Sequence, residues 1–396
     1  MIERKIMQLN LIQWVCIAIT LFVLVMSTAC TIFRNDAIIS VRQYKYLIIA
    51  FCACMLVFVY YFVPNSVIRW DLFVHYDGVN ALRGHDFSYA LKNGGYGTYY
   101  LATLYFWLIS RLPDNTLLPF FPLLLDLSVF YYIFFDRLCE EYGERRCVPY
   151  SQAFFVFFAW LSTFGFKLAV SGLRCVAACA LSSLAVYLYC KKKRLLNSAI
   201  LLIAAALIHS YALIIVPIAL LSKIKNKTPV VITMIGVNLL GARVLELVNS
   251  IIPSSMAYVK VALMQAIRYW DSYSIQAIYK RSGLGMAILF ICMIVYIGIL
   301  FLISRLYKRK IPRGSDANTM IMEYTQTLSL FSLGMCFSYL FMERTMYLVS
   351  YATVMLFSIN QDKYKINLII KVIMVGLLLY IFYSNDIGTF IANYTR

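Results

Sequence analysis

Long apolar runs recur along almost the whole chain, with little polar sequence between them. Some are long enough to span a membrane as one helix, and others fall short of the roughly 20 residues that a simple span needs. We therefore predict an all-α, polytopic integral membrane protein that forms a single domain over residues 1–396, with about 11–13 transmembrane or re-entrant helices. The run 10–33 is too long for a signal-peptide core, and we expect it to be retained. The runs cover residues 10–33, 46–64, 98–110, 116–135, 151–166, 168–190, 196–222, 229–248, 283–304, 320–341, 345–360 and 366–383.

Basic residues gather in short loops between these runs, which indicates the orientation of the chain. Loops rich in lysine and arginine remain on the cytoplasmic side of a membrane. The composition agrees with a membrane protein, because 62% of the residues are hydrophobic, 14% are charged and the mean hydropathy is +0.77. The net charge of +18 comes largely from such loops, so we do not interpret it as a nucleic-acid surface. The clearest basic loops are 191–194, 223–227, 308–310 and 363–365.

The stretch between two of these loops predicts a hairpin. If Arg194 and Lys223 lie on the same side, the chain between them must rise and return. Each arm would be about 22 Å long, which is too short to cross the membrane, so the turn near His209 would lie in a cavity rather than in lipid. The alternative is one tilted span that places 223–227 outside.

Arg174 and His209 are expected to lie at a similar depth. Arg174 precedes Lys191 by 17 positions, and His209 follows Arg194 by 15. At 1.5 Å per helical residue, these distances are roughly 25 and 22 Å from the basic hinge. A guanidinium and an imidazole near the far side of the membrane suggest a site for an anionic group outside the cytoplasm.

Two polar segments interrupt the apolar pattern, at 65–97 and 249–282. The second is predicted to be an extracytoplasmic loop, and its aromatic residues and cations, Arg268 among them, suit sugars and phosphates. An interfacial amphipathic helix is an equally good interpretation. Counting membrane spans back from Lys191 places 65–97 in the cytoplasm. Counting forward from the basic residues Arg34, Arg42 and Lys45, taken as cytoplasmic, places it outside. An external position requires one run between 98 and 170 not to cross, and we favour 151–166 because of its Ser162–Gly165 break.

Three motifs in this order resemble the EpsG-type family of polysaccharide polymerases. They are the element 71–76 (DLFVHY), the Ser171–Arg174 segment that precedes a small-residue helix and a lysine cluster, and the later run of alanines that ends in His209–Ser210. Glu343–Arg344 also lies where such proteins carry a late arginine. The resemblance covers roughly residues 46–360 and favours an external position for 65–97. Val74 departs from the family, which usually has arginine there.

The resemblance implies a membrane glycosyltransferase, similar in fold to the GT-C-like lipid-dependent enzymes. Such a protein would polymerise polyprenyl-diphosphate-linked oligosaccharide repeat units into a capsule, exopolysaccharide or O-antigen chain. It would lie in the bacterial cytoplasmic membrane, with its site facing outward. It would need no cofactor, and it would work beside a flippase and a chain-length regulator.

This chemistry assigns roles to particular residues. Charge accumulates on the departing diphosphate, so Arg174, and next Arg344, are candidates to bind it. Asp71 or His209 is the candidate base that takes the proton of the acceptor hydroxyl. Asp126 is predicted to be buried beside an unidentified cation. The possible supporting residues are His75, Tyr76, Ser210, Arg268 and Glu343. The acidic and histidine residues of 71–86 match no tight metal motif, so no metal is predicted.

Two rival classes remain open. A glycosyltransferase that uses single polyprenyl-phosphate sugars would need nearly the same residues. A flippase or transporter for lipid-linked glycans would also need interior cations, but spread along its helices rather than concentrated at their outer ends.

Overall fold

The computed structural model describes most of the chain and is almost entirely helical. The described residues are 38–62, 71–94, 99–143, 147–164, 172–256, 259–261, 263–264, 267, 275–310, 316–336, 339–358, 368–382 and 384. The elements in chain order are β1 (Ile38–Ser40), α2 (Val41–Phe62), α3 (Asp71–Ala81), α4 (Phe87–Asn93), α5 (Tyr100–Ile109), α6 (Phe120–Tyr142), β2 (Cys147–Pro149), α7 (Tyr150–Phe164), α9 (Leu173–Lys192), α10 (Leu195–Ile208), the 3₁₀ helix η2 (Ser210–Ile214), α11 (Ile215–Ser222), α12 (Thr228–Ile251), α14 (Ile275–Lys310), α15 (Asp316–Gly334), α16 (Tyr339–Phe357) and α17 (Leu368–Phe382). The predicted all-α class is confirmed. The predicted run 10–33 lies outside the described residues.

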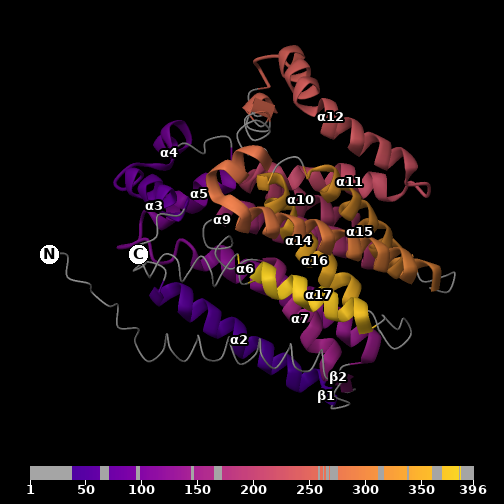
Figure 1. Cartoon of the computed structure of the whole chain (residues 1–396). Helices are drawn as coiled ribbons and strands as arrows, with labels where there is room; N and C mark the ends of the chain where they lie inside the picture. The colour runs from indigo at the N-terminus through magenta and orange to yellow at the C-terminus, as the bar shows by residue number, and fades with distance from the viewer. Residues whose placement is uncertain are drawn as a thin grey trace.

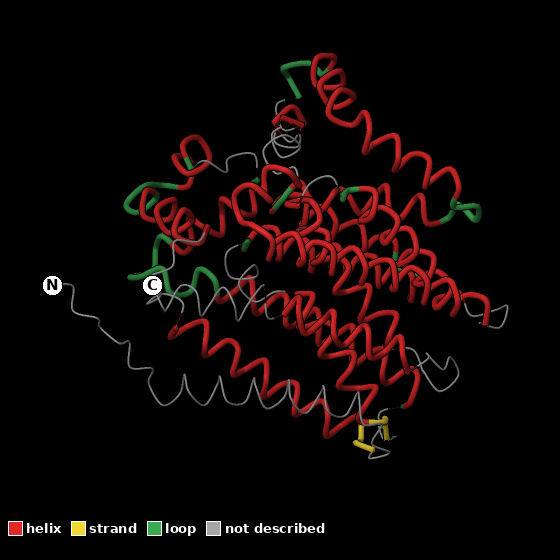
Figure 2. The backbone as a smooth tube through the Cα atoms, in the orientation of Figure 1, coloured by secondary structure: helices red, strands yellow, loops and turns green. Residues whose placement is uncertain are grey.

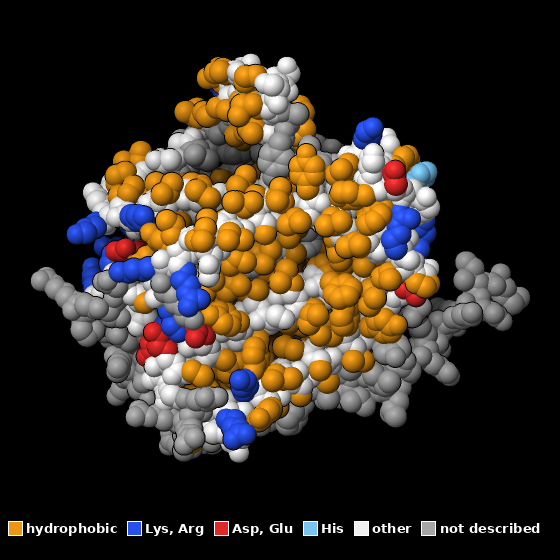
Figure 3. Space-filling model, turned by 180° about the vertical axis from the view of Figure 1, so that it is seen from behind, with side chains coloured by type: hydrophobic (Ala, Val, Ile, Leu, Met, Phe, Trp, Pro, Cys, Tyr) orange, Lys and Arg blue, Asp and Glu red, His pale blue; other side chains and the backbone are white. Residues whose placement is uncertain are grey.

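The molecule has the surface of a membrane protein. Its long helices run side by side (Figures 1 and 2), and one face shows a broad apolar band between two groups of charged side chains (Figure 3). By length and composition, Leu173–Lys191 in α9 and Gly285–Arg309 in α14 qualify as spans among the described helices. Shorter apolar helices include α5 and α10.

Three of the basic loops meet at one end of the bundle, which we call the basic end. The Lys223 ammonium lies 5.6 Å from the centre of the Tyr189 ring, close to Lys191 at the end of α9. The charge of Lys308, which lies in the last turn of α14, acts on Lys227, so the loop after α11 and the end of α14 are also neighbours. The fourth predicted loop, 363–365, lies outside the described residues.

The predicted hairpin is confirmed. Helix α10 ends at Ile208, His209 is extended with φ −158° and ψ 129°, and η2 and α11 then lead back to Lys223. Because Lys223 returns to the end of α9, both arms start and finish at the basic end. The alternative of a single tilted span is therefore wrong.

The run that fails to cross is 98–110, so the prediction that 151–166 breaks off is wrong. Helix α5 has 10 residues, about 15 Å, and packs on α3, α4 and α10. By contrast, α7 starts at the basic end, where Gln152 donates to the Phe357 carbonyl, and the chain must reach the opposite end before α9 begins. The described part of 65–97 consists of α3 and α4, which lie beside α5 away from the basic end (Figure 1).

A small two-stranded ribbon at the basic end was not predicted. Strands β1 and β2 are antiparallel, with Ile38 opposite Pro149 and Ser40 opposite Cys147. The Tyr44 hydroxyl donates to the Ala153 carbonyl at 2.8 Å, so α2 is fixed to α7 just beyond the ribbon.

The predicted loop 249–282 is shorter than expected at both ends. Helix α12 continues to Ile251 and α14 starts at Ile275. Helix α12 crosses α15 where Gly334 faces Met234, and a β-carbon at Gly334 would lie 2.5 Å from that of Met234. Beyond this crossing, α12 stands away from the bundle (Figure 1).

Candidate functional site

A polar cluster is built around Tyr99 at the end opposite the basic end. The Arg174 guanidinium carbon lies 5.3 Å from the centre of the Tyr99 ring. The His209 imidazole stacks on the same ring, with the centroids 5.9 Å apart and the planes 28° from parallel. The Tyr99 hydroxyl lies 3.1 Å from the Ser210 hydroxyl. Tyr99 therefore joins three of the residues that the sequence singled out.

Small residues in α9, α10 and η2 allow these helices to pack closely enough for Arg174 to lie beside the hairpin turn. Ala178 of α9, Ala205 of α10 and Ala212 of η2 form a buried cluster of their own. Without bulky side chains between them, the three backbones lie close together. Arg174, at the start of α9, is thereby brought beside the hairpin turn.

The hydrogen bond of His209 defines what its ring offers. Its Nδ1 atom accepts a bond from the Tyr211 backbone N–H at 3.0 Å. In a neutral imidazole with an accepting Nδ1, the proton is on Nε2. His209, which is only 9% exposed, thus presents an N–H donor that suits an anionic or hydroxyl oxygen. Acting as a base would require this ring to give up its backbone bond.

Helix α16 brings a second arginine to the same cluster. The Tyr211 hydroxyl lies 2.7 Å from that of Thr345, which fixes the hairpin turn to α16 one residue after Arg344. The charges of Arg344 and Arg174 both act on His209, that of Arg344 more strongly. Glu343 and both arginines also act on Cys175. Arg174, His209 and Arg344, distant in the sequence, are brought together.

Helix α3 brings His75 close to Arg174. Its imidazole stacks on Phe106 of α5 at 5.4 Å. Burial, and secondarily the Arg174 charge, lower the pKa of His75 to about 4, so the ring is neutral near pH 7. Tyr76 packs beside Phe73, and its buried hydroxyl has no hydrogen-bond partner among the described residues. Val74 points outward and is 63% exposed.

Two of the predicted site residues are not described by their side chains. Asp71 is the first residue of α3, and its side chain lies outside the described part of the structure. Arg268 lies entirely outside it, as do its neighbours Trp270 and Asp271. Their predicted roles remain predictions.

Asp126 is buried as predicted, but its partner is a hydroxyl rather than a cation. The Tyr351 hydroxyl donates to the Asp126 carboxylate at 2.5 Å. The pair joins α6 to α16 in the bundle interior.

An apolar cleft adjoins the cluster at Arg174. It lies between α5, α6, α9 and the last residue of α10, and has a volume of about 180 Å³. Arg174 is the only charged residue among the described ones that line it. The lining consists of Leu101, Ala102, Tyr105, Phe106, Phe121, Pro122, Leu125, Leu173, Arg174, Ala177 and Ile208.

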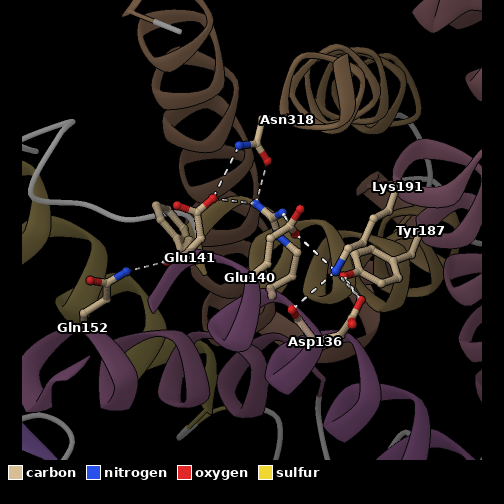
Figure 4. Close-up of polar contacts among 9 residues, drawn as sticks. Asp136, Glu140, Glu141, Gln152, Tyr187, Lys191 and Asn318 are labelled. Atoms are coloured by element: carbon tan, nitrogen blue, oxygen red, sulfur yellow. Dashed lines mark hydrogen bonds and ion pairs between the residues drawn. The ribbon is translucent and has the colours of Figure 1, made fainter. Parts of the chain in front are cut away.

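A second polar cluster lies at the basic end. Lys191 forms ion pairs with Asp136 at 2.6 Å and Glu140 at 3.2 Å, and Tyr187 donates to Asp136 (Figure 4). The fully buried Arg137 pairs with Glu140 at 2.7 Å and donates to Asn318 at 2.8 Å. These contacts bind α6, α9 and α15 together.

Tyr99 and Tyr211 were not predicted as site residues. Tyr99 lies at the start of the apolar run 98–110, where tyrosines are typical of the membrane interface. Tyr211 follows His209–Ser210 directly, and its place next to that motif was the available signal.

Comparison with known proteins identifies the family. The sequence model of the EpsG family matches residues 96–395, which is most of the chain. The chain belongs to the EpsG family. Arg174, His209 and Arg344 lie within the matched residues, whereas the EpsG-like element 71–76 lies before them. No curated protein and no solved structure matches the chain. Membership of the EpsG family gives the protein a general role in polysaccharide polymerisation in a membrane.

Proposed function

We propose that the protein joins polyprenyl-diphosphate-linked oligosaccharide repeat units into a surface polysaccharide. The observation that carries this proposal is the convergence of Arg174, His209 and Arg344 on one cluster opposite the basic loops. If the basic loops face the cytoplasm, this cluster faces outward. The host membrane would then be the bacterial cytoplasmic membrane.

The reaction transfers the growing glycan from its lipid carrier to an acceptor hydroxyl. The hydroxyl oxygen of the acceptor attacks the anomeric carbon of the donor. A new glycosidic C–O bond forms, the C–O bond to the diphosphate breaks, and the hydroxyl proton passes to a base. The polyprenyl diphosphate leaves with the bonding electrons.

The arginines suit the leaving group. Negative charge grows on the diphosphate as its bond to the sugar breaks, so fixed cations stabilise the transition state more than the ground state. Arg174 and Arg344 supply these cations, and the Nε2–H of His209 adds a hydrogen bond to the same oxygens. Glu343 orients its neighbouring arginine.

We assign the base to Asp71 in preference to His209. The Nδ1 of His209 already accepts a backbone hydrogen bond, which favours a donor role for its ring. Asp71 begins the helix that carries His75 to the cluster, so its backbone lies on the right element. His75, Tyr76, Ser210 and Arg268 would support substrate binding, and a flippase and a chain-length regulator would act beside the polymerase.

The first test is the surface-glycan ladder of cells that carry Arg174→Ala or His209→Ala, with protein levels measured in membranes. We expect long chains to be lost while single repeat units are still exported. Arg111→Ala is a matched control, since Arg111 also lies over an aromatic ring, that of Trp107 at 4.7 Å, but away from the cluster.

Other outcomes would identify the rival classes. Accumulation of repeat units on the cytoplasmic face would identify a flippase. Polymerisation in proteoliposomes from single polyprenyl-phosphate sugars, but not from diphosphate-linked repeats, would identify the other type of glycosyltransferase. A normal ladder in both variants would exclude these residues from the mechanism.

A further inference from the structure

The cleft beside Arg174 has the chemistry of a site for an anionic lipid. Its lining combines aliphatic and aromatic side chains with one guanidinium. A purely apolar molecule would bring no negative charge to that guanidinium, and a free phosphate would leave the apolar walls unfilled. A molecule with an apolar chain directly attached to an anionic head complements both parts.

The cleft also connects the outer surface of the bundle with the polar cluster. Phe121 lies on its rim and is 44% exposed, in the apolar surface that a membrane would cover. On its inner side, Arg174 lies over the Tyr99 ring, which stacks on His209. A chain that enters past Phe121 would therefore carry its head to the cluster.

A second apolar cleft provides a contrast within the same molecule. It has a volume of about 590 Å³ and lies between α5, α10, η2 and α11. Leu202, Leu207 and Leu213 contribute to its walls, and none of the described residues that line it is charged. It has room for a lipid chain but no cation for an anionic head.

We propose that the cleft beside Arg174 holds the start of the polyprenyl chain of the donor, with the donor diphosphate at Arg174. This inference rests on the proposed function for the identity of the lipid. The volume of about 180 Å³ corresponds to roughly six water-sized groups, so only the isoprene units next to the head fit. The remainder of the chain extends past Phe121 into the membrane. The leaving group is thus held at both its charged and its apolar part while the sugar is transferred.

Photo-crosslinking tests this placement without requiring any polymerisation. The probe is a polyprenyl phosphate with a diazirine in its first isoprene units, added to the full-length protein in lipid nanodiscs. Mass spectrometry then locates the labelled residues. We expect labelling on the cleft walls of α5, α6 and α9, and at least tenfold less with a neutral polyprenol that carries the same diazirine.

Two matched leucine substitutions test which cleft is used. Leu125 and Leu202 are both half-buried, and each lines one of the two clefts. Leu125→Trp fills the cleft beside Arg174 and should lower labelling at least tenfold, whereas Leu202→Trp should leave it unchanged. Arg174→Ala should remove the preference for the phosphorylated probe. If Leu125→Trp fails to fold, competition on the wild-type protein replaces it: unlabelled polyprenyl phosphate should displace the probe, and phosphatidylglycerol should not.

Several results would overturn the proposal. These are equal labelling by phosphorylated and neutral probes, labelling confined to the second cleft, and equal displacement by phosphatidylglycerol. Failure of the proposed function gives a different pattern, in which the cleft is labelled as expected but the glycan ladder of Arg174→Ala is normal. A lost ladder without labelling of the cleft would overturn the lipid placement alone.

Discussion

The two polar clusters lie at opposite ends of the same helices and are built in different ways. At the basic end, Arg137 and Lys191 meet three carboxylates at distances of 2.6–3.7 Å. At the opposite end, two arginines and one glutamate gather around two histidines and a tyrosine, and the contacts there include ring stacks and a hydroxyl contact. Among the described side chains, the first cluster has more acids than bases, and the second has more bases than acids.

This difference indicates different uses for the two ends. Complete ion pairs between α6, α9 and α15 stabilise the arrangement of the helices. At the opposite end, Arg174 lies over an aromatic ring, and a ring face attracts a guanidinium without neutralising its charge. If this distinction is correct, substitutions at the basic end should lower stability, whereas those at the opposite end should lower activity.

The largest effect is expected for Arg137→Ala. It removes a fully buried guanidinium from Asn318 and from the partly exposed Glu140, and hydrogen bonds to charged groups contribute about 1.5–3 kcal/mol each. We expect a lower melting temperature in detergent and less protein in the membrane. Lys308→Ala is the control: its pair with Glu323 is partly exposed, so its loss should cost less than about 1 kcal/mol. Equal stability of the two variants would contradict a structural role for the basic-end cluster.

Arg174→Lys should lower activity while leaving the protein stable. Lysine keeps the charge and can still lie over Tyr99, but it cannot donate two parallel hydrogen bonds to a diphosphate. We expect the polymerisation rate in proteoliposomes to fall by roughly tenfold, equivalent to about 1.4 kcal/mol. A loss of melting temperature that accounts for the loss of rate would place Arg174 with the structural residues.

Acidification should destabilise the α3 side of the site through His75. The pKa of His75 is lowered to about 4 in the folded protein, so only the unfolded chain takes up this proton between about pH 6.5 and pH 4. Stability is therefore lost as the pH falls through this range, by about 1.4 kcal/mol at one unit below 6.5. The melting temperature of wild type and His75→Phe should diverge below pH 6.5. Parallel pH curves for the two proteins would show that His75 does not contribute.

Tyr99→Phe should produce the smallest effect. The substitution keeps the ring under Arg174 and beside His209, and removes the hydroxyl that contacts the Ser210 hydroxyl. One such hydrogen bond contributes about 1 kcal/mol, so a roughly fivefold lower rate is expected. Tyr99→Ala removes the ring as well and should lower the rate further. If both variants behave alike, the hydroxyl rather than the ring organises the cluster.

The predictions from sequence succeeded where local spacing determined the answer. The basic hinge and the helical rise were enough to place Arg174 and His209 near one another, and the short arms indicated the hairpin turn. They failed where composition resembles a span but length does not allow one: α5 is apolar throughout, yet its helix has only 10 residues. Hydropathy does not distinguish such a helix from one that crosses.

Contacts between distant parts of the chain were beyond local reasoning. The bond between Tyr99 and Ser210 joins positions 111 residues apart, and that between Asp126 and Tyr351 spans 225. No periodicity or motif connects such pairs. A tyrosine at the start of an apolar run suggests an interface, and only its contacts with Arg174 and with the hairpin turn show that Tyr99 has another role.

The ribbon at the basic end determines how early in synthesis α2, the first described helix, can dock onto the rest of the bundle. Ile38 pairs with Pro149, so β1 must wait for a partner that the ribosome makes 111 residues later. At 5–20 residues per second, this delay is about 6–22 s. During that time α2 has neither its strand partner nor the Ala153 carbonyl that binds Tyr44. Docking of α2 therefore follows the synthesis of β2 and α7, and nascent chains that stop before residue 147 should contain an α2 that is not yet attached to α7.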